Sequence, residues 1–309
     1  MKSQQVTRRT FIKTAAMTAA TGIALKTSIT ADNPEANTPI IDTHLHCFAG
    51  TDSEKFPYHQ KGPYRPTALA TPEHLLSCMD AAGVDYAVVV HPEPYQDDHR
   101  YLKHCLDIGG GRLKGTILLF SDRPGSLEKM PELCQQMDII AVRVHAYAPD
   151  RLPTFGSKEL RHLWEMATNL NIAVQLHFEP RYAEGFEPLI REFSETTVLI
   201  DHMGRPFQGT PKEHARVVRW SRFPNTIMKL SSIPTTRNYP HRDIQPTIRE
   251  LTTAFGAERM VYGGGFGADA TGDSYQQAFA RARSLLLHLS KEEQNQILGG
   301  TAKRIMRFG

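Results

Sequence analysis

The sequence has little of what would place it in a specialised class of protein. Its 309 residues include 36 basic and 33 acidic side chains, with a net charge of +3, and the basic ones are scattered, so we expect no nucleic-acid partner. A hydrophobic content of 40% and a charged content of 22% exclude a disordered chain and are typical of a globular protein with a full core. The chain has four cysteines without C-x-x-C spacing, which favours free, buried thiols over two disulfides: Cys47, Cys78, Cys105 and Cys134.

Acidic residues are absent from the stretch TAAMTAATGIAL near the N-terminus, which is apolar but too short to span a bilayer. It follows the segment TRRTFIK, which contains the pair Arg8-Arg9, and the two together resemble a twin-arginine export signal. We therefore expect a signal peptide over 1–31, a flexible leader over 32–37 and a single domain over 38–309. The protein would be periplasmic or secreted, with no stable membrane anchor after cleavage. An amphipathic helix of the mature fold is the alternative interpretation.

A Gly-rich dinucleotide fingerprint is also absent after the first strand-like run, which counts against an open, doubly wound sheet. Instead, eight short runs rich in Val, Ile and Leu recur with helical segments between most of them, as expected for parallel strands buried on both faces. Eight such strands in about 270 residues predict an α/β fold of the (β/α)8 TIM-barrel type. The runs are residues 39–48, 86–94, 112–120, 138–147, 172–180, 197–206, 226–234 and 259–265.

Capping residues mark the helix starts between these runs. Thr71, followed by a proline, supplies a cap and a proline at the first helical position. Ser157 precedes an apolar stripe with three-and-four spacing, and the segments that begin at Thr210 and Ser290 have capping-box spacing. The long loop between the first strand and the first helix carries Tyr64, and we expect it to cover the mouth of the barrel.

Histidines gather at the ends of the predicted strands. His44 and His46 lie two apart at the end of the first strand, so both side chains are directed to the same side. One histidine at a strand end is usually a hydrogen-bonded structural residue, but five of the eight strands end this way. Because the carboxyl ends of barrel strands line one pocket, we expect the imidazoles to converge there. The others are His91, His145, His177 and His202.

Four motifs carry a resemblance to a known family. The stretches DTHLH, VVVHPEPYQDDHRYL, LIDHMGRP and ILGGTAKRI resemble the amidohydrolase-related proteins called amidohydrolase family 2. DHMGRP is most similar to the lactonase branch that includes 2-pyrone-4,6-dicarboxylate lactonase and sugar lactonases. The similarity extends over about residues 38–307. It implies a barrel hydrolase in which His44, His46 and His202 are catalytic and, together with His177, form the metal site of metal-using members.

The resemblance leaves the cofactor open between one divalent metal ion, Zn²⁺, and none, because the branch contains members of both kinds. A zinc site of neutral imidazoles would lower the pKa of bound water to about 7. Without a metal, the imidazoles and nearby arginines would polarise the lactone carbonyl and stabilise the oxyanion. In either case the family places a carboxylate at the end of the eighth strand, where it takes the proton of the water.

The sequence departs from the family at this carboxylate. Gly265 stands where the family ending, similar to GSDxP, has its aspartate, and glycine offers no proton acceptor. The loss of a positioned base costs about 10²- to 10⁴-fold in rate. Three interpretations are open: Asp269 folds back as the catalytic base, His177 or Glu179 serves instead, or the site binds a ligand without turning it over.

Polar residues on the strands favour a small substrate that is anionic or sugar-like. Arg143 offers a bidentate fork for a carboxylate, and its alternative is an ion pair with a neighbouring acid such as Asp201 or Glu179. Lys229 lies within an apolar strand and is expected to be paired. The residues predicted to bind the substrate are Arg143, His145, Arg205 and Tyr64.

The sequence thus predicts an exported lactonase that opens a lactone or cyclic ester of a sugar or carboxylic acid by water attack. Because of Gly265, the first alternative is a catalytically degenerate barrel that acts as a binding or sensor protein. The second is a metal-dependent decarboxylase of an aromatic acid, against which Gly265 counts more heavily, since that chemistry also needs the metal-site aspartate. An oligomeric state is not specified.

Overall fold

A computed structural model describes residues 38–309, which fold into a (β/α)8 barrel with eight parallel strands arranged in chain order. Strands β1 and β8 lie side by side, and Oγ1 of Thr43 donates to the carbonyl oxygen of Tyr262 over 2.6 Å. The predicted signal peptide over 1–31 and leader over 32–37 lie outside the described residues. The strands are β1 (Ile41–Leu45), β2 (Tyr86–Val90), β3 (Leu113–Leu118), β4 (Ile139–Ala146), β5 (Ala173–Phe178), β6 (Val198–Ile200), β7 (Thr226–Leu230) and β8 (Met260–Tyr262).

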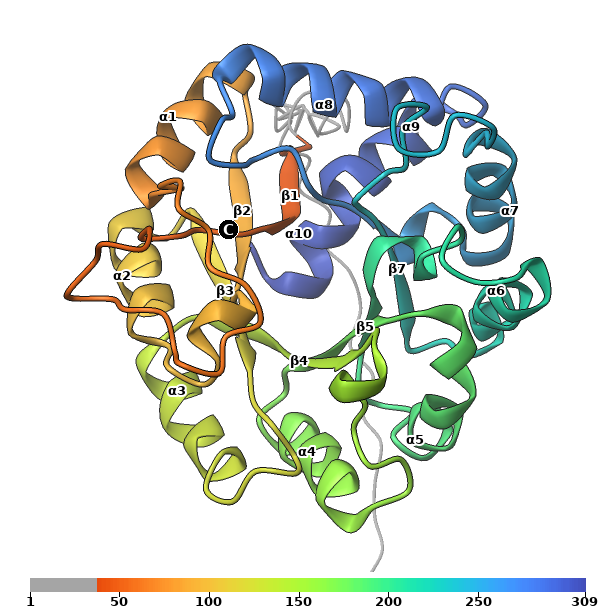
Figure 1. Ribbon diagram of the computed structural model, residues 1–309. Helices are drawn as coiled ribbons and strands as arrows, with labels where there is room; N and C mark the ends of the chain where they lie inside the picture. The colour runs from red at the N-terminus through yellow and green to blue at the C-terminus, as the bar shows by residue number, and fades with distance from the viewer. Residues whose placement is uncertain (1–37) are drawn as a thin grey trace, which may run out of the picture. The chain divides into compact units, whose positions relative to one another are not determined.

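Helices surround the strands on the outside of the barrel (Figure 1). Four predicted helix starts are confirmed: the side chains of Thr71 and Ser157 accept hydrogen bonds from the first turn, and Thr210 and Ser290 form capping boxes. The helices are α1 (Pro72–Ala82), α2 (Arg100–Gly109), α3 (Met130–Gln136), α4 (Lys158–Asn169), α5 (Glu187–Glu192), α6 (Pro211–Val218), α7 (Gln245–Phe255), α8 (Gly272–Leu285), α9 (Lys291–Asn295) and α10 (Thr301–Met306).

All eight predicted strands are present, each lies inside its predicted run, and all are shorter than that run. Two of them end early at a left-handed turn or a glycine. The run 197–206 leaves the sheet after β6, because His202 and Met203 have left-handed backbone angles that no strand can contain. The run 259–265 ends with β8, and Gly264 follows with a φ of 96°. Both departures lie at the carboxyl ends of the strands, where the sequence places functional residues.

The core has two parts separated by the barrel wall. Large apolar side chains fill the space between strands and helices. Inside the barrel, a second apolar cluster forms a floor at the amino end, and α10 and Phe308 close it. The strand residues of this floor are Ile41, Val88, Val90, Ala141, Ala173, Leu199, Ile227 and Val261. Because strand side chains alternate, the next inward positions lie nearer the carboxyl end, and there polar residues replace the apolar ones.

No helix among residues 38–309 is long and apolar enough to cross a membrane. The four cysteines are free thiols; Cys47, Cys78 and Cys105 are buried, as predicted, and Cys134 is half-buried.

Candidate active site

An irregularity in β1 directs both histidines of the H-x-H pair into the barrel. Ile41 belongs to the interior floor and Leu45 to the outer core, so strict alternation from Ile41 would turn His44 and His46 outward. However, the pairing with β2 shifts register between Asp42 and Leu45. The carboxylate of Asp42 accepts the main-chain N–H of His44 over 2.9 Å, which stabilises this shift. The sequence correctly predicted that the two histidine side chains lie on the same side of β1, and the register shift places that side in the barrel interior.

A layer of four buried polar side chains lies between the apolar floor and the mouth: Arg143, Gln175, Asp201 and Lys229. Nε and Nη2 of Arg143 donate to Oδ2 of Asp201 over 3.1 and 2.9 Å. The amide of Gln175 donates to Oδ1 and Oδ2 of Asp201 over 2.9 and 3.0 Å. Lys229 is paired, as predicted: its Nζ lies 3.5 Å from Oδ1 of Asp201 and donates to the carbonyl of Thr43 over 2.7 Å. Arg143 therefore forms an ion pair with Asp201, the alternative to its predicted role as a substrate clamp.

Charge compensation keeps Asp201 ionised inside the barrel. Burial alone would raise the pKa of its carboxyl, but His44, Arg143 and Lys229 hold that pKa well below its usual value. Burial lowers the pKa of Lys229 to about 8, against the attraction of Asp201. At neutral pH the layer therefore holds two cations and one anion. Its net positive charge favours an anionic group at the mouth.

Five imidazoles form a continuous row across the mouth, from β1 through the end of β6 and β5 to β4. Successive ring centroids are 5.3 Å apart for His46 and His44, 4.5 Å for His44 and His202, 5.1 Å for His202 and His177, and 5.1 Å for His177 and His145. The register of β4 on β5 places His145 beside His177. Burial lowers the pKa of every ring, to about 4 for His46 and about 3 for His202, so all five are neutral at pH 7.

A tight turn after β6 brings His202 into this row. His202 and Met203 have φ angles of 56° and 57°, an uncommon backbone conformation for residues other than glycine. Ser231, just after β7, holds the turn: its Oγ lies 3.2 Å from the main-chain nitrogen of His202 and 3.0 Å from Nδ1 of the same residue. These two contacts determine the orientation of the imidazole.

A cavity of about 140 Å³ lies beside His177 and His202 and is also lined by Arg205. The guanidinium of Arg205 lies 5.6 Å from the ring centroid of Tyr147, and its Nη1 is buried without a hydrogen-bond partner among residues 38–309. A buried donor without a hydrogen-bond partner is unusual, and a bound ligand that accepts this hydrogen bond would explain it. Arg205 therefore fits the predicted role in anion binding better than Arg143 does.

The long loop between β1 and α1 lies against the segment that follows β2. The main-chain N–H of His59 donates to the carbonyl of Pro94 over 2.8 Å. Tyr64 in this loop is 45% exposed. Desolvation, together with the nearby charge of Glu93, raises the pKa of the Tyr64 hydroxyl to about 12. The hydroxyl therefore remains protonated and able to donate to a substrate.

The end of β8 has no room for a carboxylate in the present arrangement. A Cβ on Gly263 would lie 2.7 Å from the main-chain nitrogen of His44, and one on Gly265 would lie 2.5 Å from Cδ2 of the buried Tyr275. Asp269 is exposed in the turn before α8, and within the described part of the chain it has no hydrogen bond or ion pair with the histidines. The structure thus does not bring Asp269 into the site, where the sequence predicted a base.

Three residues have the spacing of a metal site. Ligand atoms of His44, Asp201 and His202 lie within 4.8 Å of one another, and Nε2 of His44 is buried with no hydrogen-bond partner in the described region. The carboxylate is less suitable, because Arg143 and Gln175 already donate to both of its oxygens, which together have about four lone-pair sites. A catalytic zinc ion takes three protein ligands. As arranged, the donor set supplies two free imidazoles and does not fit zinc.

The sequence identified most side chains of this mouth but missed two acids. Of the four predicted metal ligands, His46 and His177 lie in the imidazole row but outside the group with metal spacing. His91 lies outside the row, and its Nε2 is 2.8 Å from a main-chain carbonyl after β2. The missed acids are Asp201, considered only as an ion-pair partner, and Glu93. Their available signal was position, because both follow strand ends next to a histidine or proline, in LIDH and HPEP.

Imidazoles at the carboxyl ends of barrel strands, next to an unpartnered arginine and a cavity, define a barrel enzyme that acts on small molecules. The chain belongs to the amidohydrolase family, since the family model described as Amidohydrolase matches residues 41–308. This membership confirms the resemblance that the four motifs carry.

The relatives include proteins named as lactone hydrolases. The chain is 32% identical to the 4-sulfomuconolactone hydrolase of Rhizobium radiobacter over 171 residues, 53% of this chain and 52% of that protein, so the match spans about half the length of that relative. It is 26% identical to the L-fucono-1,5-lactonase of Burkholderia ambifaria over 241 residues, 72% of this chain and 78% of that one. A crystal structure of a probable 2-pyrone-4,6-dicarboxylic acid hydrolase from Acinetobacter baumannii, with citric acid bound, shares the fold: its TM-score is 0.73 at 21% identity, over 87% of this chain and 99% of that one.

Proposed function

We propose that the protein is a hydrolase that opens a lactone with an anionic substituent, by attack of water on the ring carbonyl. The observation that supports this most is the row of five neutral imidazoles next to a buried layer of net positive charge. Donors fixed in a water-poor site stabilise the oxyanion of acyl transfer at little reorganisation cost. The two relatives named for lactone hydrolysis support the same class of reaction.

Individual roles follow from position. His202 is assigned to the carbonyl oxygen, toward which a neutral imidazole donates an N–H. The ring of His44 is 4.5 Å from that of His202, but its Nδ1 lies 3.3 Å from Oδ1 of the ionised Asp201, so its proton lies on Nδ1 and its Nε2 is an acceptor. Arg205, with Nη1 free beside the small cavity, is assigned to the anionic substituent. Tyr64 on the covering loop supplies a further hydroxyl donor. No step is assigned to a metal ion, because the oxygens of Asp201 are already taken.

The test is a hydrolysis assay on the full-length chain with three lactones: 4-sulfomuconolactone, 2-pyrone-4,6-dicarboxylate and L-fucono-1,5-lactone. Proton release measured by pH-stat should exceed the spontaneous rate for at least one anionic lactone. Arg205→Ala should raise KM for that substrate by about 10- to 150-fold, the equivalent of a hydrogen bond to a charged group. Arg100→Ala is the matched control, since Arg100 is 63% exposed, pairs with Asp98 and does not line the cavity beside Arg205.

The crowded glycines at the end of β8 favour a second candidate, a protein that binds lactones or hydroxy acids without turnover. Calorimetric binding of a lactone in the absence of any hydrolysis would support this candidate and refute the first. Neither hydrolysis nor binding of the three lactones would refute both.

We also propose that residues 1–31 export the protein, on the basis of the Arg8-Arg9 pair and the apolar stretch that follows it. When the full chain is expressed in a bacterial host, the cleaved protein should be recovered from the periplasm or medium. A variant with Lys at both positions should remain in the cytoplasm, and equal export of both forms would contradict the proposal.

A further inference from the structure

The buried carboxylates near the barrel mouth differ in the hydrogen bonds that they already accept. Asp42 accepts from the main-chain N–H of His44 and of Gly264 over 2.9 and 2.7 Å and from the hydroxyl of Tyr275 over 2.7 Å. Asp201 is bound to Arg143 and Gln175, as described above. Neither acid is available to take a proton from water. Another group must do this if the protein hydrolyses lactones, because Gly265 replaces the family aspartate and Asp269 is exposed.

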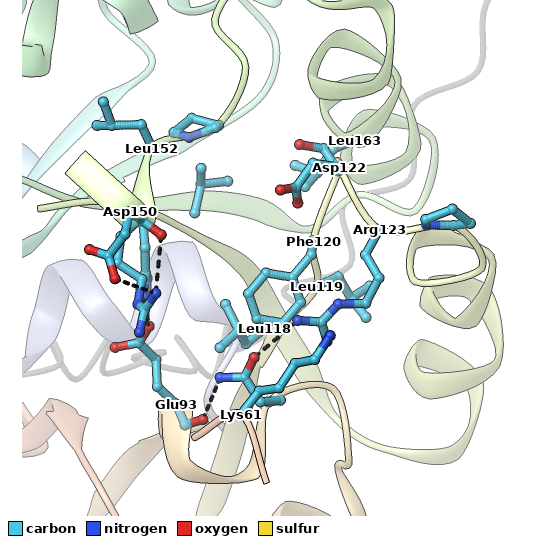
Figure 2. Close-up of a pocket in the computed structure, with 17 residues that line it drawn as sticks. Lys61, Glu93, Leu118, Leu119, Phe120, Asp122, Arg123, Asp150, Leu152 and Leu163 are labelled. Carbon is cyan, nitrogen blue, oxygen red and sulfur yellow. Dashed lines mark hydrogen bonds and ion pairs between the residues drawn. The ribbon is translucent and has the colours of Figure 1, made fainter. Parts of the chain in front are cut away.

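Glu93 is a third buried carboxylate, and it borders a cavity of about 400 Å³ (Figure 2). The cavity lies among the loops after β2, β3 and β4. Its apolar wall includes Leu118, Leu119 and Leu152, and Arg123 contributes charge on another side. The cavity is large enough for a small substrate together with water, and Glu93 belongs to the edge nearest the imidazole row, since His145 lines the same cavity.

Glu93 is held so that it acts on His145. Its Oε1 lies 2.9 Å from Nδ1 of His145 and 3.4 Å from Nε of Arg151. Its Oε2 accepts from the hydroxyl of Tyr147 over 2.5 Å. Burial alone would raise the pKa of Glu93, but the hydrogen bonds of His145 and Tyr147 and the charge of Arg151 lower it, so the carboxylate is ionised.

His145 presents Nδ1 to Oε1 of Glu93 at 2.9 Å, a contact bent away from ideal hydrogen-bond geometry, and its Nε2 has no partner in the described region. An ionised carboxylate accepts only, so the proton of the neutral ring lies on Nδ1, toward Glu93. Nε2 then carries a lone pair, and this atom is buried without a hydrogen-bond partner among residues 38–309. His44 faces Asp201 in a similar way, but over a longer Nδ1–Oδ1 distance of 3.3 Å and with Oδ1 already accepting from Gln175. A carboxylate that orients an imidazole whose second nitrogen is free is the arrangement of a general base.

We propose that His145 is the general base of this protein and that Glu93 positions it, together replacing the carboxylate that β8 lacks. The proposal rests on the lactone hydrolysis proposed above. Nε2 of His145 accepts a proton from water as the water oxygen bonds to the lactone carbonyl carbon. The resulting oxyanion re-forms the C=O bond as the ring C–O bond breaks, and the imidazolium returns the proton to the departing alkoxide. The products are a carboxylic acid and an alcohol on one molecule, with no further reactant.

The test uses the full chain and the lactone that the wild-type protein hydrolyses fastest in the panel above. His145→Ala should lower kcat by about 10²- to 10⁴-fold, and added imidazole should restore at least about tenfold of that loss, because it supplies the missing base. His177→Ala is the matched control: its ring is 5.1 Å away and has no carboxylate partner, so imidazole should not restore its activity. Glu93→Gln should lower kcat at least about tenfold and leave KM within about twofold, as expected for a positioning residue.

A measurement on the unmodified site keeps the proposal testable if His145→Ala does not fold. Nitrogen-15 NMR of the full chain should show the His145 ring neutral at pH 7 with its proton on Nδ1, and Glu93→Gln should change that tautomer population. A proton on Nε2, or a His145→Ala variant with wild-type kcat, would overturn the role of the pair while leaving lactone hydrolysis intact. A wild-type chain that hydrolyses none of the lactones would instead overturn the proposed function, and the role of the pair with it.

Discussion

Replacing Asp201 by asparagine tests the buried ionic layer that supports the histidine row. The substitution removes the one carboxylate of the four-residue layer and keeps the size of the side chain. The Arg143 and Lys229 side chains are 4% and 0% exposed, so water cannot replace the lost charge. We expect the free energy of unfolding to fall by about 3–5 kcal/mol, because breaking a buried pair leaves an uncompensated charge.

The two cations that Asp201 pairs with determine where in this range the loss of unfolding free energy lies. Lys229 has a pKa of about 8, so at pH 7 its ammonium group can lose its proton at a cost of about 1.4 kcal/mol. Deprotonation therefore limits how much an unpaired Lys229 can destabilise the variant. Arg143 cannot deprotonate and keeps its charge next to a neutral amide. The loss should therefore lie near the lower end, about 3 kcal/mol, a large part of the 5–15 kcal/mol that stabilises a typical domain.

Urea unfolding followed by the fluorescence of the buried Trp164 and Trp220 measures the effect. A loss of about 3 kcal/mol lowers the midpoint by about 1 M or more. Asp107→Asn is the matched control: it breaks the exposed pair with Lys103 at 2.9 Å and should cost less than about 1 kcal/mol. If Asp201→Asn is no more destabilising than Asp107→Asn, the account of the layer is wrong.

Three other predictions concern stability and binding. Gly265→Asp should destabilise the fold by about 1–3 kcal/mol in the same urea assay, because its Cβ would lie 2.5 Å from the ring of Tyr275; unchanged stability would show that the ring moves freely. Between pH 8 and 10.5 the free energy of unfolding of the wild-type protein should rise by about 3 kcal/mol relative to that of Lys229→Met. The reason is that the Lys229 amine has a pKa of 10.5 in the unfolded chain and about 8 in the folded one, so the unfolded chain binds the proton more strongly. Plots of unfolding free energy against pH that run parallel for the two proteins would contradict this. Tyr64→Phe should raise KM about two- to tenfold, the equivalent of one hydrogen bond, and steady-state kinetics with no change in KM would exclude contact with the substrate.

The sequence was most informative where the physics is local. Thr71, Ser157, Thr210 and Ser290 cap helices through bonds to residues three positions away, so the motif contains both partners. Apolar runs bounded by turns identified all eight strands for the same reason. The carboxyl ends of the strands were predicted too long; at β6 this is because the left-handed turn at His202 is held by Ser231, 29 residues away.

The candidate site was less predictable, because partners far apart in the chain decide the role of each side chain. From the sequence, Arg143 was a plausible substrate clamp, but in the structure two of its nitrogens donate to Asp201, 58 positions further on. The position of Glu93 after a strand end was its one signal, and its partner could not be read from it, since only the return of the chain in β4 brings His145 to it. Asp269, four residues after Gly265, was close in sequence but points to solvent rather than to the histidines.

The sequence by itself determined the barrel, the helix caps and the placement of imidazoles at the carboxyl ends of the strands, because periodicity and capping act over a few residues. Tertiary structure alone decided which of those imidazoles lie next to a carboxylate, which arginine has an unpartnered nitrogen, and which side chain packs against Gly265. These outcomes depend on the shift in β1, the register of β4 on β5 and the packing of Tyr275. Each is a relation between distant segments, and a change of one residue in register would turn a side chain to the other face.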